Sequence, residues 1–249
     1  MPNFKLTLEY DGTDFHGFQR QPRLRTIQGT LEARFSRLLG ENIAVTGAGR
    51  TDAGVHALGQ VANFHTTRPL AQDRITRALN TALPPDLKVR QCQHVPEDFH
   101  ARRCARSRTY RYTIIQRPTP SPLLGRYALI LPEPLDLPAM RAAAAPLLGR
   151  RDFRAFQASG SETKTTERNL MRLDCLRQAH TIEITAEADS FLYHMVRIIV
   201  AALLRVGRGL LPPDALAAAL ASGRRLPKSA PAPPCGLCLL QVSYEEHLT

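Results

Sequence analysis

The segment Gly47–His56 gathers residue types that could carry out carboxylate chemistry. Its sequence, GAGRTDAGVH, places Arg50, Thr51 and Asp52 among three glycines and between two apolar stretches. Glycines let a backbone turn sharply and let a ligand approach it closely, and an ionised aspartate can attack or deprotonate a substrate. From composition alone, the loop also fits an ordinary hairpin turn in which Asp52 only bonds its own backbone. A phosphate-binding loop does not fit, because the Gly-Lys-Ser/Thr ending is missing.

The cysteines and histidines form no pattern that predicts a metal site. Cys235 and Cys238 have CxxC spacing but no second ligand pair, so they predict thiols packed in a core. The histidines show no metal-ligand spacing either. We therefore expect neither a metal nor a cofactor. The five cysteines are scattered and odd in number, which indicates reduced thiols in a cytoplasmic protein rather than a secreted disulfide framework.

The net charge favours a polyanionic partner. The formal charge is +11 and the pI is about 10.0, and nucleic acid is the commonest partner of such a chain. Of the 33 basic residues, 29 are Arg and 4 are Lys. Arginine suits phosphate contacts and stacking on bases, although a GC-rich genome would give the same bias. The longest apolar run, Ile198–Leu204, is too short to span a bilayer, so we expect a soluble protein with no membrane partner.

The elements that must position the Asp52 loop follow from periodicity in the first half of the chain. Strands are expected at residues 4–10, 44–47, 60–65 and 87–94, and helices at 27–39 and 70–83. Thr26 is the expected N-cap of the first helix, and Gly40 is its expected C-terminal stop. The order is β-α-β-β-α-β, with the Asp52 loop between its two middle strands.

The second half repeats this order. Strands are expected at 108–116, 168–176, 181–188 and 237–244, and helices at 138–148, 191–206 and 213–222. The fold class is therefore α+β: two ferredoxin-like β-α-β-β-α-β halves that form a mixed, largely antiparallel sheet with helices on one face. We expect the halves to comprise residues 1–104 and 105–249. Element order alone does not establish a function.

Six separated segments match one known family in order and spacing. They are EYDGTDFHGFQRQ (9–21), IQGTLE (27–32), GRTDAGVHALGQVANF (49–64), DFHARRCA (98–105), RTYRY (108–112) and FLYHMVR (191–197). On these residues the chain resembles the bacterial tRNA pseudouridine synthase A family over nearly its whole length. The resemblance implies two related halves with a basic cleft between them, and a homodimer that binds tRNA. It also implies an isomerase that converts uridine to pseudouridine at positions 38, 39 and 40 of the anticodon stem-loop, without a cofactor.

The resemblance also implies roles for individual residues. Asp52 corresponds to the catalytic aspartate, which is ionised at neutral pH because an ordinary aspartate has a pKa near 4. It either attacks C1′ of the flipped nucleotide or helps to remove the C2′ proton and form a glycal. Arg197 corresponds to the arginine that pairs with this carboxylate. Tyr110 corresponds to the tyrosine that stacks on the uracil, with a hydroxyl available for removing the C5 proton. Arg50 is a candidate for filling the space that the flipped base leaves.

Five further arginines are expected to contact the RNA. Arg20, Arg23 and Arg25 follow the YDG motif in a loop that could clamp a tRNA arm, and Arg108 and Arg111 belong to a basic run that could follow phosphates. A charge run is more often a solvated face, so these assignments depend on the overall charge.

Two other functions fit the same sequence. One keeps the chemistry but acts on a different RNA, and the other is a catalytically silent RNA-binding protein. The presence of Asp52, Tyr110 and Arg197 together argues against the silent protein, because binding alone does not require them. The chain also departs from the family in one strand, where Cys235 and Cys238 replace the usual Lys or Glu and Tyr. That departure leaves open whether the strand contacts a base.

Overall fold

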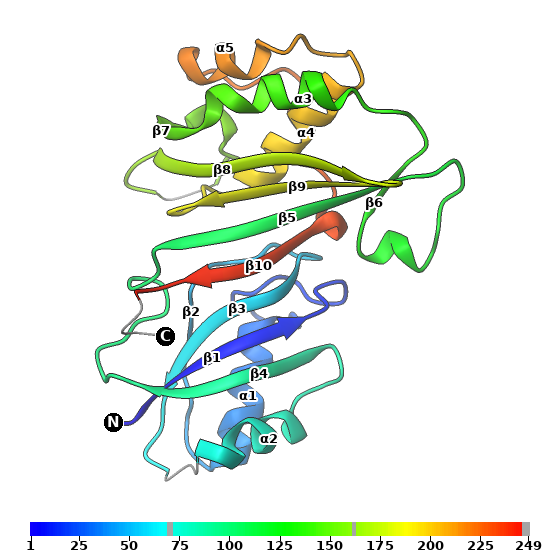
Figure 1. Cartoon of the computed structure of the whole chain (residues 1–249). Helices are drawn as coiled ribbons and strands as arrows, with labels where there is room; N and C mark the ends of the chain where they lie inside the picture. The colour runs from blue at the N-terminus through cyan, green and yellow to red at the C-terminus, as the bar shows by residue number, and fades with distance from the viewer. Residues whose placement is uncertain (69–71, 161–162, 246–249) are drawn as a thin grey trace. The chain divides into compact units, whose positions relative to one another are not determined.

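The computed structural model describes residues 1–68, 72–160 and 163–245 (Figure 1). The chain forms two compact units, the first made of residues 1–106 together with the segment from Cys238 onward, and the second of Ser107–Leu237. The expected halves were 1–104 and 105–249, so the units differ from them chiefly in the last strand. That strand belongs to the first unit, although it follows the second in the sequence.

The first unit has the predicted element order. Its elements are β1 (Asn3–Tyr10), α1 (Ile27–Leu39), β2 (Val45–Gly47), β3 (His56–His65), α2 (Gln72–Ala82), β4 (Leu87–Val95) and, from the end of the chain, β10 (Leu237–Ser243). β1 lies between β3 and β4 and is antiparallel to both, β2 is antiparallel to β3, and β10 runs parallel to β3 (Figure 1). The start expected for the second helix, residues 70 and 71, lies outside the described residues.

The core of this unit lies between β1, β3 and α1. Phe64 on β3 contacts Phe4 on β1 and Phe35 on α1, with ring centroids 5.6 and 5.5 Å apart. Helix α1 ends as predicted. The Thr26 hydroxyl accepts a hydrogen bond from the Gly29 amide, and Gly40 adopts the left-handed conformation, with φ of 68°, that only glycine adopts without strain. Both caps follow from residue type and position.

Part of the other face of β1 is also buried. Apolar residues alternate along this strand, which predicts that Lys5 faces solvent. Glu9 on this face is exposed, but Lys5 is only 6% exposed. Its ammonium lies 6.0 Å from the centroid of the Phe99 ring and 5.6 Å from that of Tyr244. Burial lowers the pKa of Lys5, and the two rings offset part of the cost of burying its charge. Segments remote in sequence therefore cover this face.

A pair of buried amides fixes one of these covering segments. Asn63 Nδ2 donates to Asn3 Oδ1 at 3.1 Å, and Asn63 Oδ1 accepts from the Ala101 amide at 2.9 Å. Asn3 Nδ2 in turn donates to the Phe99 carbonyl at 2.9 Å. These side chains bond the Phe99 carbonyl and the Ala101 amide, so this segment can pack on the sheet without being a strand.

The second unit shares the strand arrangement of the first. Its main elements are β5 (Ser107–Gln116), α3 (Leu137–Ala144), β8 (Glu167–Gln178), β9 (Thr181–Ala188), α4 (Met195–Gly207) and α5 (Ala215–Ser222), with short strands β6 (Leu129–Leu131) and β7 (Gly149–Asp152). β9 lies between β5 and β8 and is antiparallel to both. In the first unit, β3 lies between β1 and β2 in the same way. Helix α3 packs on β8, α4 and α5 (Figure 1). The α+β class and the mixed, largely antiparallel pairing are thus as predicted.

The helix expected at residues 191–206 begins later than its apolar periodicity indicated. Helix α4 starts at Met195, so Phe191 lies outside it. His194 has a φ of 59°, and this left-handed conformation cannot continue a helix toward the N-terminus. Phe191 instead packs against Tyr110 of β5.

We predict that Asn63→Ala lowers the free energy of unfolding by roughly 1–3 kcal/mol, because it leaves the Ala101 amide and the side-chain oxygen Oδ1 of Asn3 buried without the Asn63 side chain as a partner. Urea denaturation followed by circular dichroism measures the change. The exposed Asn42 provides the control, since Asn42→Ala should change stability by no more than about 0.5 kcal/mol. Equal urea midpoints for the two variants would contradict the role assigned to the amide pair.

Candidate active site

Asp52 lies in the loop that joins β2 to β3, residues 48–55. The Ala48 amide donates to the Val61 carbonyl at 2.7 Å, which closes the start of the loop onto β3. The Val55 amide donates to the carbonyl of Asp52 itself at 3.2 Å, which makes a tight turn after the aspartate. The Asp52 side chain is half-buried, whereas the neighbouring Arg50 is exposed. Arg50 makes no hydrogen bond or ion pair with any residue that the structure describes.

Two glycines let the stretch after β1 pack directly against this loop. A Cβ on Gly12 would lie 2.0 Å from the Val55 carbonyl oxygen, and a Cβ on Gly17 would lie 2.8 Å from that of Thr51. Gly17 also has a φ of 83°, a conformation that favours glycine. Only residues without a side chain permit this approach of the two backbones.

Hydrogen bonds then join the two segments. The Phe18 amide donates to the Thr51 carbonyl at 3.0 Å, and the Gly54 amide donates to the Phe15 carbonyl at 3.3 Å. The backbone on both sides of Asp52 is therefore attached to residues 15–18. This explains the proximity of the YDG-containing segment and the Asp52 loop, which are far apart in sequence.

Buried polar side chains lie under the loop. The Tyr10 hydroxyl lies 2.9 Å from Thr51 Oγ1, and Gln60 Nε2 donates to the Gly49 carbonyl at 3.0 Å and to the Tyr10 oxygen at 3.4 Å. Tyr10, Thr51 and Gln60 are each 5% exposed or less. Burial raises the pKa of Tyr10 well above its ordinary value, so the phenol keeps its proton.

His56, the first residue of β3, meets the stretch after β1 from the other side. Its Nδ1 lies 3.1 Å from the Gly12 amide nitrogen and 3.2 Å from Asp11 Oδ1. An unprotonated Nδ1 accepts from Gly12, whereas a protonated Nδ1 donates to Asp11. In either state the imidazole attaches the end of the loop to residues 11 and 12.

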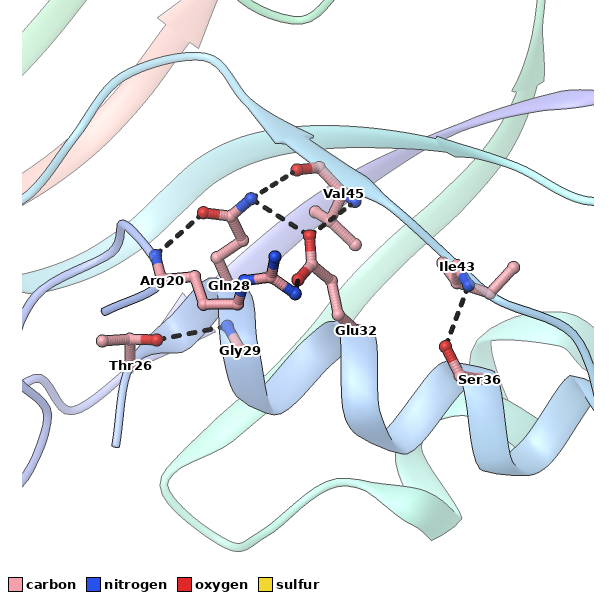
Figure 2. A network of polar contacts seen from close by, with 8 residues as sticks. All are labelled: Arg20, Thr26, Gln28, Gly29, Glu32, Ser36, Ile43 and Val45. Carbon is pink, nitrogen blue, oxygen red and sulfur yellow. Dashed lines mark hydrogen bonds and ion pairs between the residues drawn. The ribbon is translucent and has the colours of Figure 1, made fainter. Parts of the chain in front are cut away.

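Helix α1 connects the arginine-bearing loop to β2 (Figure 2). Gln28 Oε1 accepts from the Arg20 amide at 2.9 Å, and Gln28 Nε2 donates to the Val45 carbonyl at 3.1 Å. One turn later, Glu32 Oε1 accepts from the Val45 amide at 3.1 Å, and Glu32 Oε2 pairs with the Arg20 guanidinium at 3.2 Å. These contacts give a structural role to the polar residues of the IQGTLE segment, because Gln28 and Glu32 lie four residues apart and so share one helix face.

The structure separates the three arginines of residues 20–25 by their contacts. Arg25 forms a bidentate pair with Asp86, both contacts at 2.8 Å, and its guanidinium lies 4.0 Å from the centroid of the Phe15 ring. Arg20 is paired with Glu32 but its side chain is 71% exposed. Arg23 is exposed and has a φ of 62°. Arg25 therefore has a structural role in the first unit, while Arg20 and Arg23 present charge to solvent.

Tyr110 and Arg197 belong to the second unit. Tyr110 lies on β5 opposite Ala186 of β9, and its buried ring meets Phe191 edge to face, with centroids 5.3 Å apart. Arg197 lies in the first turn of α4 and is half-buried. Its Nε donates to the Ala232 carbonyl at 2.8 Å, and its own carbonyl accepts from the Ala232 amide at 3.0 Å. The Arg197 side chain is thus anchored close to its base.

The two remaining arginines of the RNA-contact prediction have partners on the second unit. Arg108 is buried and donates to the Asp189 carbonyl at 2.6 Å. Arg111 pairs with Glu183 of β9 at 3.4 Å. Both therefore contribute to the structure of this unit, whatever they also contact.

Sequence reasoning did not assign roles to Tyr10, Gly12, Gly17 and Gln60. The two glycines had a usable signal, because they lie in the EYDGTDFHGFQRQ segment that already matched the family. Tyr10 and Gln60 also lie in matched segments, residues 9–21 and 49–64, but each sits within an expected strand and has the residue type of an ordinary strand position.

Within the described ranges, no three His, Cys, Asp or Glu side chains are grouped so that they could hold a metal ion. Neither Cys235 nor Cys238 forms a disulfide bond with a described residue, and burial raises the pKa of Cys235. The helices of the described chain include none that is long and apolar enough to cross a membrane.

Comparison with known proteins identifies the family. A family model described as tRNA pseudouridine synthase matches residues 7–102 and 143–245, which include Asp52 and Arg197 but not Tyr110. The tRNA pseudouridine synthase A of Moorella thermoacetica is 44% identical to this chain, covering 98% of it and 100% of that protein. The proteins of the same name from Acetivibrio thermocellus and Azorhizobium caulinodans are 42% and 44% identical, covering 98% and 100% of this chain and 100% and 96% of their own lengths. With its matches extending through both units, the chain belongs to the tRNA pseudouridine synthase family.

Proposed function

We propose that this protein isomerises uridine to pseudouridine at positions 38, 39 and 40 of the tRNA anticodon stem-loop, with Asp52 as the catalytic nucleophile. Membership of the family makes it an isomerase that acts on tRNA. The observation that carries the role of Asp52 is its place in the β2–β3 loop, whose backbone is bonded to residues 15–18 before and after the aspartate. A carboxylate on such a fixed loop is oriented before substrate arrives.

The reaction requires one glycosidic bond to break and another to form. The N1–C1′ bond of the flipped uridine breaks, the uracil turns, and C5 bonds to C1′. N1 gains a proton and C5 loses one, so the product is an isomer of the substrate and no group donor or redox partner is needed. The Asp52 carboxylate would assist either by attacking C1′ or by helping to remove the C2′ proton.

Tyr110 and Arg197 are proposed to complete the site from the second unit. The Tyr110 ring would stack on the extracted uracil, which contributes roughly 1–3 kcal/mol and so offsets much of the cost of unstacking the nucleotide. Arg197 would pair with the Asp52 carboxylate and stabilise its ionised form. The hydrogen bond from Arg197 Nε to the Ala232 carbonyl supports this role, because it fixes the position of the guanidinium group.

The charge of the chain supports binding to the tRNA backbone. We propose that the exposed arginines Arg20, Arg23 and Arg50 contact the RNA directly, with Arg50 filling the space of the flipped base. Arg25, Arg108 and Arg111 are proposed as weaker contributors, since each already has a protein partner. We further propose that the protein acts as a homodimer in the cytoplasm. Sedimentation of the purified chain with and without tRNA would test for the dimer.

We predict that Asp52→Asn abolishes turnover while leaving RNA binding intact. An unmodified tRNA with uridines at positions 38–40, labelled with tritium at C5, should release tritium with the unsubstituted protein. Release by Asp52→Asn should fall at least about 1,000-fold, because the amide cannot replace the carboxylate as a nucleophile or base. Asp98→Asn, the same charge change at an exposed site of the same unit, should retain release. Tight tRNA binding without release by the unsubstituted protein would instead indicate a binding protein.

We predict that Arg197→Lys lowers kcat by about 10- to 100-fold with little change in KM for tRNA. Lysine keeps the positive charge but cannot hold the Ala232 carbonyl through Nε while directing a planar fork elsewhere. Arg205→Lys is the matched control, because Arg205 lies on the same helix and also donates to a carbonyl, that of Pro227. The same loss of kcat in both variants would show that the effect is structural.

A further inference from the structure

Three polar side chains are buried in the first unit directly beneath the Asp52 loop. They come from β1 (Tyr10), from β3 (Gln60) and from the loop itself (Thr51). Burying a hydroxyl or an amide is unfavourable unless each donor and acceptor finds a partner. Apolar residues could fill the same space. The hydrogen bonds of these three groups therefore indicate a role beyond packing.

The Gln60 amide has a single possible orientation. Its oxygen accepts from the Val61 amide at 3.1 Å, and its nitrogen faces two oxygens, the Gly49 carbonyl at 3.0 Å and the Tyr10 hydroxyl at 3.4 Å. Reversing the amide would set its N–H groups against the N–H of Val61 and its oxygen against the carbonyl of Gly49. Gln60 therefore donates both of its hydrogens to the loop side.

The orientation of the Gln60 amide also determines the direction of the hydrogen bond between Tyr10 and Thr51. Because Gln60 donates to the Tyr10 oxygen, the phenolic hydrogen is available for Thr51 Oγ1, which lies 2.9 Å away. The buried phenol remains protonated at all ordinary pH values, so the contact persists. Hydrogen bonds in a buried chain of this kind strengthen one another.

Gly49 depends on this support more than its neighbours do. A Cβ on Gly49 would meet no atom within 4 Å, so close packing does not hold this part of the loop. The Gln60 amide fixes its carbonyl instead. Gly49 and Thr51 are the two neighbours of Arg50 in sequence, and Thr51 directly precedes Asp52.

We propose that Tyr10 and Gln60 are positioning residues for the reaction: they fix the backbone on both sides of Arg50 and thereby set the direction of the Asp52 carboxylate. The inference rests on the proposed role of Asp52. Both side chains are buried under the loop and bonded to it, so the role assigned to them is to hold the loop and not to touch the substrate. Their loss is therefore expected to slow the chemical step and to leave the exposed RNA-contacting arginines in place.

The test compares variants of the whole chain that each lose a hydroxyl group. Tyr10→Phe removes only the hydroxyl and should lower kcat for tritium release by about 10- to 100-fold, with KM for tRNA changed by less than about 2-fold. Thr51→Val should have a similar effect, and the double variant should be no worse than Tyr10→Phe alone, because all three variants lack the Tyr10–Thr51 hydrogen bond. Thr51→Ser keeps the hydroxyl and should restore most of the activity.

Tyr244→Phe is the matched control. Tyr244 is another buried tyrosine of the first unit, and its hydroxyl donates to the Ala101 carbonyl at 2.7 Å, away from the Asp52 loop. The Tm of Tyr244→Phe should decrease about as much as that of Tyr10→Phe, while the kcat of Tyr244→Phe should stay near that of the unsubstituted protein. Equal kcat values for Tyr10→Phe and Tyr244→Phe would overturn the positioning role.

A second measurement separates this inference from the proposed function. Hydrogen–deuterium exchange of the amides in residues 48–55 should be faster in Tyr10→Phe than in Tyr244→Phe, whether or not the protein turns over. If the unsubstituted protein releases no tritium, the proposed function fails. Unchanged exchange in Tyr10→Phe would overturn the claim that Tyr10 holds the loop, even if the unsubstituted protein is active.

Discussion

The close approach of two backbones determines the geometry around Asp52. The carbonyls of Thr51 and Val55 lie where the Cβ atoms of Gly17 and Gly12 would be, so the loop and the stretch after β1 touch without intervening side chains. Main-chain hydrogen bonds then join the two segments at residues 51 and 54. A loop held in this way loses its freedom on folding rather than on binding substrate, and preorganisation of this kind favours catalysis. The β2–β3 hairpin, His56 and the buried pair of Tyr10 and Gln60 all act on this same short segment.

The structure also distinguishes arginines by their contacts and exposure, although every arginine contributes equally to the net charge. Arg25 is neutralised by Asp86 and stacked on Phe15, and Arg108 is buried against a main-chain carbonyl. Arg20 is paired with Glu32 but remains exposed, and Arg50 is exposed without a partner among the described residues. Attraction of a polyanion thus depends on a subset of the 29 arginines, while others stabilise the units themselves. A formal charge of +11 indicates the kind of partner but not the residues that meet it.

Local patterns predicted much of the fold, and contacts remote in sequence explain what they missed. The order of elements in the first unit and the caps Thr26 and Gly40 follow from periodicity and residue type. The burial of Lys5 could not be predicted, because the rings of Phe99 and Tyr244 that cover it come from distant segments. Phe191 continues the apolar period of α4, yet the left-handed backbone at His194 separates it from the helix.

The candidate site was predictable in a different way. Composition alone favoured a plain turn at Asp52 over a catalytic loop, and it was the resemblance of several separated segments that favoured the catalytic loop. The residues that support the loop could not be found from one sequence, because Tyr10 and Gln60 fit a strand pattern whether or not they bond to each other. Their significance appears only when the register of β1 on β3, with Leu8 opposite Gln60, brings them under the same turn.

The position of β10 has a consequence for how the chain matures. This strand runs parallel to β3, with Cys238 opposite His56 and Leu239 opposite Ala57, and so completes the unit that contains the Asp52 loop. It is synthesised only after the whole of the second unit, residues 107–237. Parallel pairing across such a separation closes slowly, since a long loop must be ordered before the contact forms. The edge of β3 next to His56 therefore stays unpaired until the second unit has been synthesised, and the nascent protein acquires β10 beside the Asp52 loop only after that.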